Sequence, residues 1–131
     1  MISSLPGTAK LFLLIGCITA MAAVMVGAFG AHGLKARVAP ELMSVYQTGV
    51  EYHFYHALGI ILVGLAAIHL PDSALLRGAG WSMLAGIILF SGSLYLLALT
   101  GLRALGAITP VGGAAFIAAW GLFAAAVFRA P

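Results

Sequence analysis

Four long apolar segments, separated by short polar ones, dominate the chain. They cover about residues 9–29, 52–70, 79–100 and 110–128. Each holds roughly the 20 apolar residues that a helix needs to cross the hydrocarbon core of a bilayer. The polar segments between them leave no room for a water-soluble domain. The pattern therefore predicts a single all-α domain over residues 1–131, an integral membrane four-helix bundle.

Two helix starts can be placed from local sequence signals. Pro40 and Glu41 suit a first helical turn, because proline lacks an N–H that this turn leaves unpaired and an acid interacts favourably with the helix dipole. A helix that starts there is longer than the second span, so its first part is expected to protrude from the membrane or to lie along its surface. Thr109 and Pro110 are predicted as the N-cap and first residue of the last helix, which makes residues 101–108 a connector.

The first span runs into a glycine-rich stretch, GAFGAHG, whose glycines are spaced by three: Gly27, Gly30 and Gly33. Glycine lets one backbone pass close to another and can adopt positive φ angles. We therefore expect the run to end the first helix and to pack against the start of the second. This packing would bring His32 near Glu51 and His53.

Composition strengthens the membrane prediction. Hydrophobic residues make up 63% of the chain and charged residues 7%, whereas a soluble domain carries about 25% charged residues. Six basic and three acidic side chains cannot cover a soluble globule of this size. The chain is therefore predicted to be an integral membrane protein.

The net charge of +3 does not indicate a nucleic-acid partner, because the basic residues are scattered between the apolar segments. They are typical of charges that flank membrane spans. Four helices place both chain ends on one side of the membrane. The basic residues divide equally between the two sides: Lys10, Arg77 and Arg129 on the side of the ends, Lys35, Arg37 and Arg103 on the other. The positive-inside rule therefore assigns no orientation.

The single cysteine, Cys17, excludes an intrachain disulfide. The stretch Leu14–Cys17 is like the lipidation motif of a signal peptide, but only three residues separate it from Lys10. That is fewer than the roughly 7–15 apolar residues of a signal peptide's central region. Cleavage after the first span is a second alternative. Because this span is long enough to remain in the membrane, we keep it as the first of four helices.

A polar and aromatic cluster, GVEYHFYH, stands at the start of the second predicted span. His53 and His56 are three residues apart and therefore face the same side of a helix, at the depth where the span begins. Tyr52 shares this face, and Gln47 and Glu51 form an adjoining stripe. These residues, with His32, are the candidate ligand or interaction cluster.

Three interpretations of the cluster are open. The imidazoles can ligate a metal ion with Glu51 or His32, although no third ligand stands at a diagnostic spacing. Two histidines from different helices can hold a haem, which within one chain requires His32. In the third interpretation the side chains lie in the interfacial belt with their polar tips in water or bonded to a loop, where they can still serve recognition. We favour the third, expect no cofactor and assign no metal ligands.

Small residues and mid-span hydroxyl groups are expected to pack the helices. Pairs of small residues four apart allow close approach between helices of one chain or of two copies: Ser82 and Gly86, Ala114 and Ala118, Gly121 and Ala125. Ser91 and Ser93 are predicted to hydrogen-bond to carbonyls of their own helix. Interfacial anchoring or packing is expected of three larger residues: Trp81, Tyr95 and Trp120.

Four stretches together resemble a known family: GAFGAHGL, YQTGVEYHFYHALG, LFSGSLYLLALTG and LGAITPVGGAAFIAAW. Over residues 11–128 the chain is similar to the domain-of-unknown-function family 423, also called uncharacterised protein family 0382. The resemblance implies a small four-span membrane protein, as found in bacterial inner membranes, with no established reaction. It carries over no catalytic residues. The matching motif positions are candidates for the family's function: Gly27, Gly30, His32, Gly33, Gln47, Tyr52, His56, Ser91, Gly92, Ser93, Tyr95, Thr109, Pro110 and Gly112.

These observations predict a non-enzymatic accessory or interaction component of the bacterial inner membrane. The sequence has no nucleophile–base arrangement and no phosphate-binding loop. Its acidic residues fall at or outside the predicted span boundaries, away from the membrane interior where ion and proton paths carry ionisable groups: Glu41, Glu51 and Asp72. The expected partners are the lipid bilayer and a second copy or another membrane protein.

Three alternatives are kept. The first is a metal- or haem-binding protein built on His32, His53 and His56. The second is a small-solute transporter that forms only as an oligomer. The third, an intramembrane enzyme, would need Glu51 or a histidine as its acid–base group.

Overall fold

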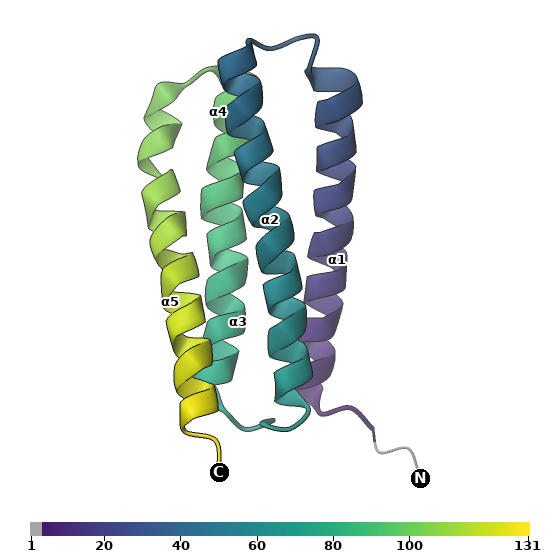
Figure 1. Cartoon of the computed structure of the whole chain (residues 1–131), viewed down its shortest axis with the longest axis vertical. Helices are drawn as coiled ribbons and strands as arrows, with labels where there is room; N and C mark the ends of the chain where they lie inside the picture. The colour runs from purple at the N-terminus through teal and green to yellow at the C-terminus, as the bar shows by residue number, and fades with distance from the viewer. Residues whose placement is uncertain (1–3) are drawn as a thin grey trace.

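Four long rods stand side by side in the computed structural model, which describes residues 4–131 (Figure 1). The first three residues of the predicted domain lie outside the described part. The elements follow in chain order: α1 (Gly7–Phe29) with a π-helical turn (Gly30–Leu34), α2 (Pro40–Ala67), α3 (Ala74–Gly86) with a π-helical turn (Ile87–Ser91) and α4 (Gly92–Thr100), then a 3₁₀ turn (Arg103–Ala107) and α5 (Thr109–Phe128). The segments α3 and α4 form one continuous rod. Residues 4–131 contain no β-strand.

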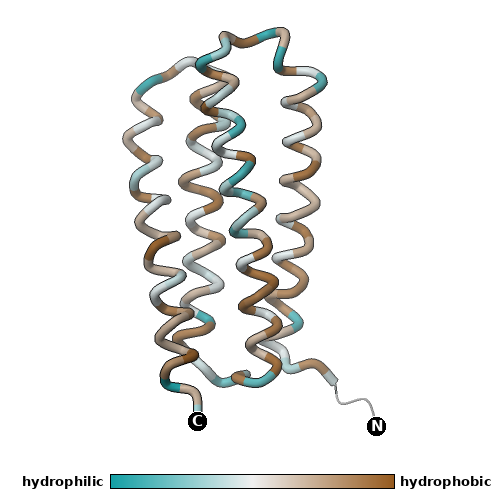
Figure 2. Tube along the Cα trace, viewed as in Figure 1, coloured by the Kyte–Doolittle hydropathy of each residue, from teal (hydrophilic) through white to brown (hydrophobic). Residues whose placement is uncertain are grey.

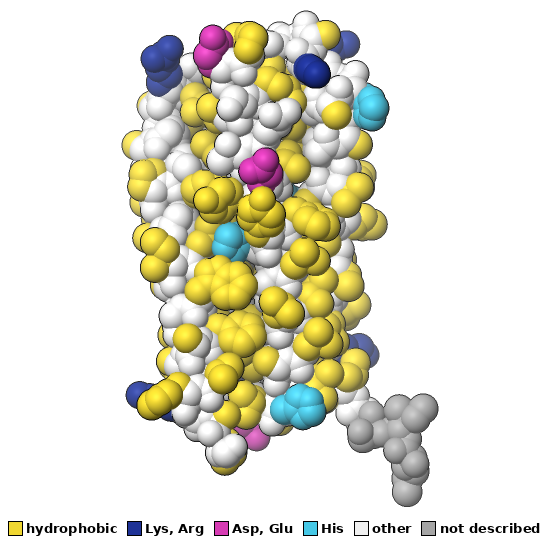
Figure 3. Space-filling view, in the orientation of Figure 1, with side chains coloured by type: hydrophobic (Ala, Val, Ile, Leu, Met, Phe, Trp, Pro, Cys, Tyr) yellow, Lys and Arg dark blue, Asp and Glu magenta, His cyan; other side chains and the backbone are white. Residues whose placement is uncertain are grey.

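Each rod is long and apolar enough to cross a membrane. The four have 26 to 28 residues, and at 1.5 Å per residue a 28-residue helix is about 42 Å long. Hydrophobic positions run along the rods (Figure 2), and the Lys and Arg side chains gather at the two ends of the bundle (Figure 3). The prediction of an all-α membrane four-helix bundle is confirmed. The start of α1 and the end of α5 lie at the same end, as expected for an even number of spans (Figure 1).

The predicted spans 9–29, 79–100 and 110–128 lie within these rods, whereas the span 52–70 runs past the end of α2 at Ala67. Helix α2 does begin at Pro40, but its first part packs within the bundle. Met43 and Tyr46 are both buried there. The alternative that this part lies along the membrane surface is therefore wrong, because it stands upright beside the other rods (Figure 1), whereas its protrusion from the membrane stays a prediction.

The glycine run does not end the first helix. Gly30–Leu34 continues α1 as a π-helical turn, and the glycines serve close packing instead. Gly30 lies against Tyr46 and Met43, and Gly27 lies against Val50, so the predicted packing on the first half of α2 is confirmed. The physical reason is that tertiary contact with α2 favours continued helix over the turn that the glycines alone would permit.

Two further glycines set the closest approach of α1 and α2. A Cβ added to Gly16 would lie 2.9 Å from the backbone nitrogen of Ile61, and one added to Gly64 would lie 2.9 Å from that of Leu13. Backbone atoms cannot move aside as a side chain can, so both positions require glycine. This is the small-residue packing on which helix association in lipid depends.

The core has a lower and an upper cluster. The lower cluster joins all four rods and includes Phe12, Ile60, Met83 and Phe116. The upper cluster consists of buried residues on three rods: Leu34, Met43, Tyr46 and Ala98. Between them lie the buried polar side chains of α2 and of the rod formed by α3 and α4.

The connector between α4 and α5 shows that the predicted N-cap role of Thr109 is wrong. Gly101, with a φ of 71°, ends α4 in the left-handed conformation. Residues 101–108 do form the predicted connector, which contains the 3₁₀ turn. Thr109 and Pro110 both lie in the first turn of α5, but the Thr109 side chain makes no capping hydrogen bond. It hydrogen-bonds across to Ser93 instead, with 2.7 Å between the hydroxyl oxygens.

Candidate functional site

The cluster on α2 lies in the middle of the bundle and not at the mouth of the span. Its histidines are buried, with 6% of His53 and 5% of His56 exposed. Both residues stand near the midpoint of the helix Pro40–Ala67. The interfacial placement favoured by the sequence is therefore wrong. The reason is that α2 begins at Pro40, so the cluster lies near the middle of the helix, where α4 and α5 supply partners for both imidazoles.

The hydrogen bonds of His56 define its tautomer. Its Nδ1 lies 2.8 Å from the carbonyl oxygen of Tyr52, an acceptor, so Nδ1 carries the proton. Its Nε2 accepts a hydrogen bond of 3.1 Å from the indole N–H of Trp120 on α5. Both ring nitrogens are thus used within the chain, and the ring is neutral. A metal or haem iron could bind Nε2 only if the Trp120 bond were broken.

Aromatic rings enclose His56 on α2. The Phe116 ring stacks on the imidazole with centroids 3.5 Å apart and planes 11° apart. The Tyr52 ring also stacks with the His56 imidazole, with ring centroids 6.0 Å apart. The Phe90 ring packs against Tyr52, with centroids 4.7 Å apart. These contacts tie α2 to α5 and to the π-helical turn before α4. They exclude water from the imidazole and make it a packing element.

His53 joins α2 to α4. Its Nδ1 lies 2.9 Å from the hydroxyl oxygen of Tyr95 on α4. Tyr95 in turn packs against Tyr46, with ring centroids 5.2 Å apart. Tyr46 donates its hydroxyl proton to the carbonyl of Val26 on α1. The sequence prediction that Tyr95 packs is confirmed.

The two mid-span serines differ from each other. Ser91 is fully buried, and its hydroxyl donates to the carbonyl of Gly49 on α2 at 2.7 Å, so the prediction of a bond within its own helix is wrong. The π-helical turn Ile87–Ser91 contributes, because it turns this part of the rod relative to a regular helix. Ser93 does donate to a carbonyl of its own rod, that of Phe90, at 2.9 Å.

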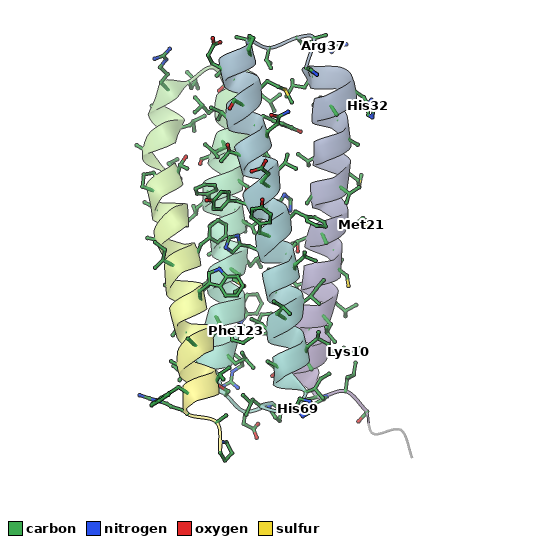
Figure 4. All side chains as sticks on the ribbon, in the orientation of Figure 1. Lys10, Met21, His32, Arg37, His69 and Phe123 are labelled. Atoms are coloured by element: carbon green, nitrogen blue, oxygen red, sulfur yellow. The ribbon has the colours of Figure 1, made fainter. Side chains whose placement is uncertain are left out.

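His32 does not meet the other histidines. Figure 4 shows it pointing outward from α1, away from α2. Gly27 on α1 lies against Val50 on α2. His32 is five residues above Gly27 and His53 is three residues below Val50, so the two histidines differ by about 12 Å in height along the bundle. The predicted meeting of His32, Glu51 and His53 is therefore wrong, and a haem held by His32 and a histidine of α2 has no basis in this arrangement.

Among residues 4–131 no three His, Cys, Asp or Glu side chains come close enough to hold a metal ion. The members of the predicted cluster instead separate into two groups. His53 and His56 face the interior, whereas Gln47 and Glu51 are exposed on the outer surface of α2. Tyr52, with 39% of its surface exposed, lies between the two groups.

Glu51 lies well inside the length of α2. It is the twelfth residue of a 28-residue helix, about 17 Å from the upper end. A hydrocarbon core of about 30 Å centred on the 42 Å rod would start about 6 Å from that end and would include Glu51. The predicted place of Glu51 at a span boundary stays a prediction.

The neighbours of Glu51 at this depth are apolar. Gly27 packs against Val50, so α1 presents Met25 and Phe29 at this level, with 65% and 52% of their surfaces exposed. Figure 3 shows an acidic side chain among hydrophobic ones, well below the charged upper rim, and Figure 2 shows hydrophilic positions interrupting the upper half of α2. Ser44, Gln47 and Glu51 thus form a polar stripe on the outer surface of α2. We call these three residues the α2 stripe.

A hollow of about 360 Å³ lies beside the stripe, along the seam between α1 and α2. Gln47, Glu51 and Tyr46 line it on α2, and Gly27 and Ala31 line it on α1. Because Gly27 and Ala31 have no large side chains, the α1 surface is recessed here. The hollow can therefore receive side chains of another molecule while the amide of Gln47 and the carboxyl group of Glu51 supply hydrogen bonds.

The fold and these contacts define a helical membrane protein of four spans, with an internally hydrogen-bonded core and one polar stripe on its outer surface. Residues 26–113 match the family described as "Protein of unknown function (DUF423)". The chain is 51% identical over 111 residues to the UPF0382 membrane protein YwdK of Bacillus subtilis, which covers 85% of this chain and 90% of the relative. It is 46% identical over 120 residues to a UPF0382 membrane protein of Staphylococcus haemolyticus, covering 92% and 97%. The chain therefore belongs to the DUF423 family of UPF0382 membrane proteins, as its sequence motifs predicted.

A UPF0382 membrane protein of Staphylococcus epidermidis is similar as well, at 48% identity over 111 residues, covering 85% of this chain and 89% of the relative. A comparison with solved structures finds no significant match.

Sequence reasoning missed two partners of the cluster, Phe116 and Trp120. Both lie on α5, and they are 60 and 64 residues away from His56 along the chain. The available signal was the spacing of four between them, which puts their rings on one face of α5. Nothing in that spacing shows that the face meets α2.

Proposed function

We propose that this protein is a non-enzymatic component of the bacterial plasma membrane that acts by binding another membrane-embedded protein surface. The observation that carries the proposal is the α2 stripe. A carboxyl group and an amide on a lipid-facing surface are costly, at about 2.5–3.5 kcal/mol for an acid at the centre of a span. A protein partner that offers hydrogen-bonding groups would remove this cost.

The interior supports the same proposal. Each buried histidine and serine makes a hydrogen bond to a residue of another rod, and no buried side-chain nitrogen or oxygen in residues 4–131 lacks a partner. Groups that are engaged in this way hold the bundle together and are not free to act as acid, base or ligand. The outward polar groups are thus the better candidates for function.

The proposed location follows from the type of fold. Outer-membrane proteins of bacteria are typically β-barrels, whereas this chain crosses the membrane as helices. The similar proteins described above come from bacteria and are named membrane proteins. These points favour the plasma membrane of a bacterium.

Photo-crosslinking in native membranes tests the proposal. A benzophenone-bearing phenylalanine replaces Phe54, which is exposed one turn below Glu51, or Val111 on α5 as the control. Ser91 bonds to Gly49 and Gly112 packs on Phe90, so Val111 lies at about the depth of the stripe. We expect a discrete adduct from position 54 and none from position 111.

The adduct from position 54 should disappear when Gln47 and Glu51 are both replaced by leucine. An adduct that persists in this variant, or equal adducts from both positions, would show contact without recognition by the stripe. Lipid adducts alone from position 54 would overturn the proposal.

A further inference from the structure

We propose that the partner of the α2 stripe is a second copy of this chain, packed as a parallel two-fold dimer in which Gln47 of each copy hydrogen-bonds to Glu51 of the other. The inference rests on the proposed function, because it names the partner of the same stripe. Its experiment is designed so that the dimer can fail while the interaction proposal holds.

The geometry of the outer face of α2 suits a parallel dimer. Four exposed residues on it are spaced by seven: Ser44, Glu51, Leu58 and Leu65. Gln47 and Phe54, also exposed, occupy the first two intermediate positions of the same heptad pattern, whereas the third, Ile61, is half-buried against Gly16 of α1. A spacing of alternately three and four residues is the seam of two helices that cross at about 20°. The upper half of this seam is polar and the lower half is apolar.

The polar groups of the seam complement their own copies. In such a seam the side chain of Glu51 lies opposite Glu51 of the other helix, and the hole that it enters also includes the residue four positions earlier on that helix, which is Gln47. Helical side chains point towards the N-terminus, so the carboxyl group of Glu51 extends towards that residue. The amide N–H of Gln47 donates, and the carboxyl oxygen of Glu51 accepts. Because the dimer is two-fold symmetric, the hydrogen bond between Gln47 and Glu51 forms twice.

A second copy also matches the stripe in depth. Copies inserted in the same orientation present Gln47 and Glu51 at one level, so their polar groups meet without any shift of the helices. An isologous contact of this kind closes after two copies. The small residues Gly27 and Ala31 beside the stripe allow the second copy to approach closely and to occupy the hollow along α1.

Disulfide crosslinking of the full-length chain in lipid vesicles tests the dimer. Cys17, the single and exposed cysteine, is first changed to serine. New cysteines are then placed one at a time at Ser44 and Leu58 on the seam, or at Val111 on α5 as the control at similar depth. We expect linked dimers from positions 44 and 58 and not from position 111.

The stripe is then altered without touching the introduced cysteines. Replacing Gln47 and Glu51 by leucine should weaken association about tenfold, because two hydrogen bonds between helices are lost in lipid. The variant Glu51→Gln should associate like the parent chain, because an amide keeps an acceptor for Gln47. Equal linking from all three cysteine positions, or no effect of the leucine variant, would overturn the dimer.

The two proposals fail differently. If position 54 forms a stripe-dependent adduct with a different polypeptide and the seam cysteines do not link, the second copy is the wrong partner and the interaction proposal holds. If neither experiment shows a stripe-dependent contact, both proposals are overturned.

Discussion

His56 is a structural hydrogen-bonding group at the contact of α2 with α5. Its Nδ1–H donates a hydrogen bond to the Tyr52 carbonyl, and its Nε2 accepts one from the Trp120 indole N–H. The ring therefore needs no water as a hydrogen-bond partner. The same logic applies to Ser91, whose hydroxyl uses a carbonyl of α2. In lipid, no water is present to hydrogen-bond with an unpaired polar group. Each polar side chain of the core therefore requires a hydrogen-bonding partner on a neighbouring part of the protein.

The change Trp120→Phe removes the donor to His56 and leaves Nε2 buried without a partner. We expect a loss of about 1–3 kcal/mol in the free energy of unfolding, the usual cost of a buried group that loses its hydrogen bond. The measurement is reversible unfolding in mixed detergent micelles. The matched control is Trp81→Phe, at a tryptophan that is 48% exposed and packs edge-on against Phe12. Equal losses in the two variants would contradict this role of the Trp120 indole.

At the scale of the helices, glycines decide how close the rods come. Gly112 on α5 lies directly against the backbone nitrogen of Phe90, next to the π-helical turn that ends at Ser91. On the same helix, Gly121 faces open space, with no heavy atom within 4 Å of an added Cβ. The two glycines lie on the same helix and differ in what stands opposite them, so they can be compared as a pair.

We expect Gly112→Ala to destabilise the bundle by about 1–3 kcal/mol, because the new methyl group would overpack against backbone atoms. Gly121→Ala should be neutral or stabilising by up to about 1 kcal/mol, because alanine favours helix over glycine. Unfolding of both variants under the same detergent conditions gives the comparison. A Gly112→Ala protein as stable as the parent would show that α5 can move away from the π-helical turn Ile87–Ser91 without cost.

At the scale of the whole molecule, helix length and hydropathy account for the four spans, but the basic residues do not decide which end of the bundle faces the cytoplasm. Arg77 and Lys10 lie at the end with the termini, and Lys35 and Arg37 lie at the other, so basic residues do not favour one side. The orientation of such a protein should respond to small changes in charge, because loop lysines and arginines act as the main topological signal.

We expect Lys35→Gln with Arg37→Gln to place both termini in the cytoplasm, since three basic residues then oppose one. The reverse pair, Lys10→Gln with Arg77→Gln, should place them outside. A reporter fused to the C-terminus, active on only one side of the membrane, distinguishes the two. If both variants give the same side, orientation is set by something other than the count of basic residues.

Sequence reasoning succeeded where the cause is local. Bilayer thickness and hydropathy predict four spans, and proline and an acid mark the start of α2. It failed where the outcome depends on another helix. Thr109 makes its hydrogen bond to Ser93 rather than to its own helix end, and Ser91 reaches Gly49, because those partners become available only when the rods pack.

The placement of the candidate site shows the same division. Glu51 and His53 are two residues apart, about 200° around a helix, so one lies on the outer surface and the other faces the core. Because the spans are apolar around most of their circumference, periodicity does not mark the inner face. The sequence by itself determined the membrane, the number of spans, the family and the residues that could carry function. Only the tertiary structure decided which polar residues are used up in holding the bundle together and which remain on its surface, because burial and hydrogen bonding in lipid are properties of packed neighbours and not of a single helix.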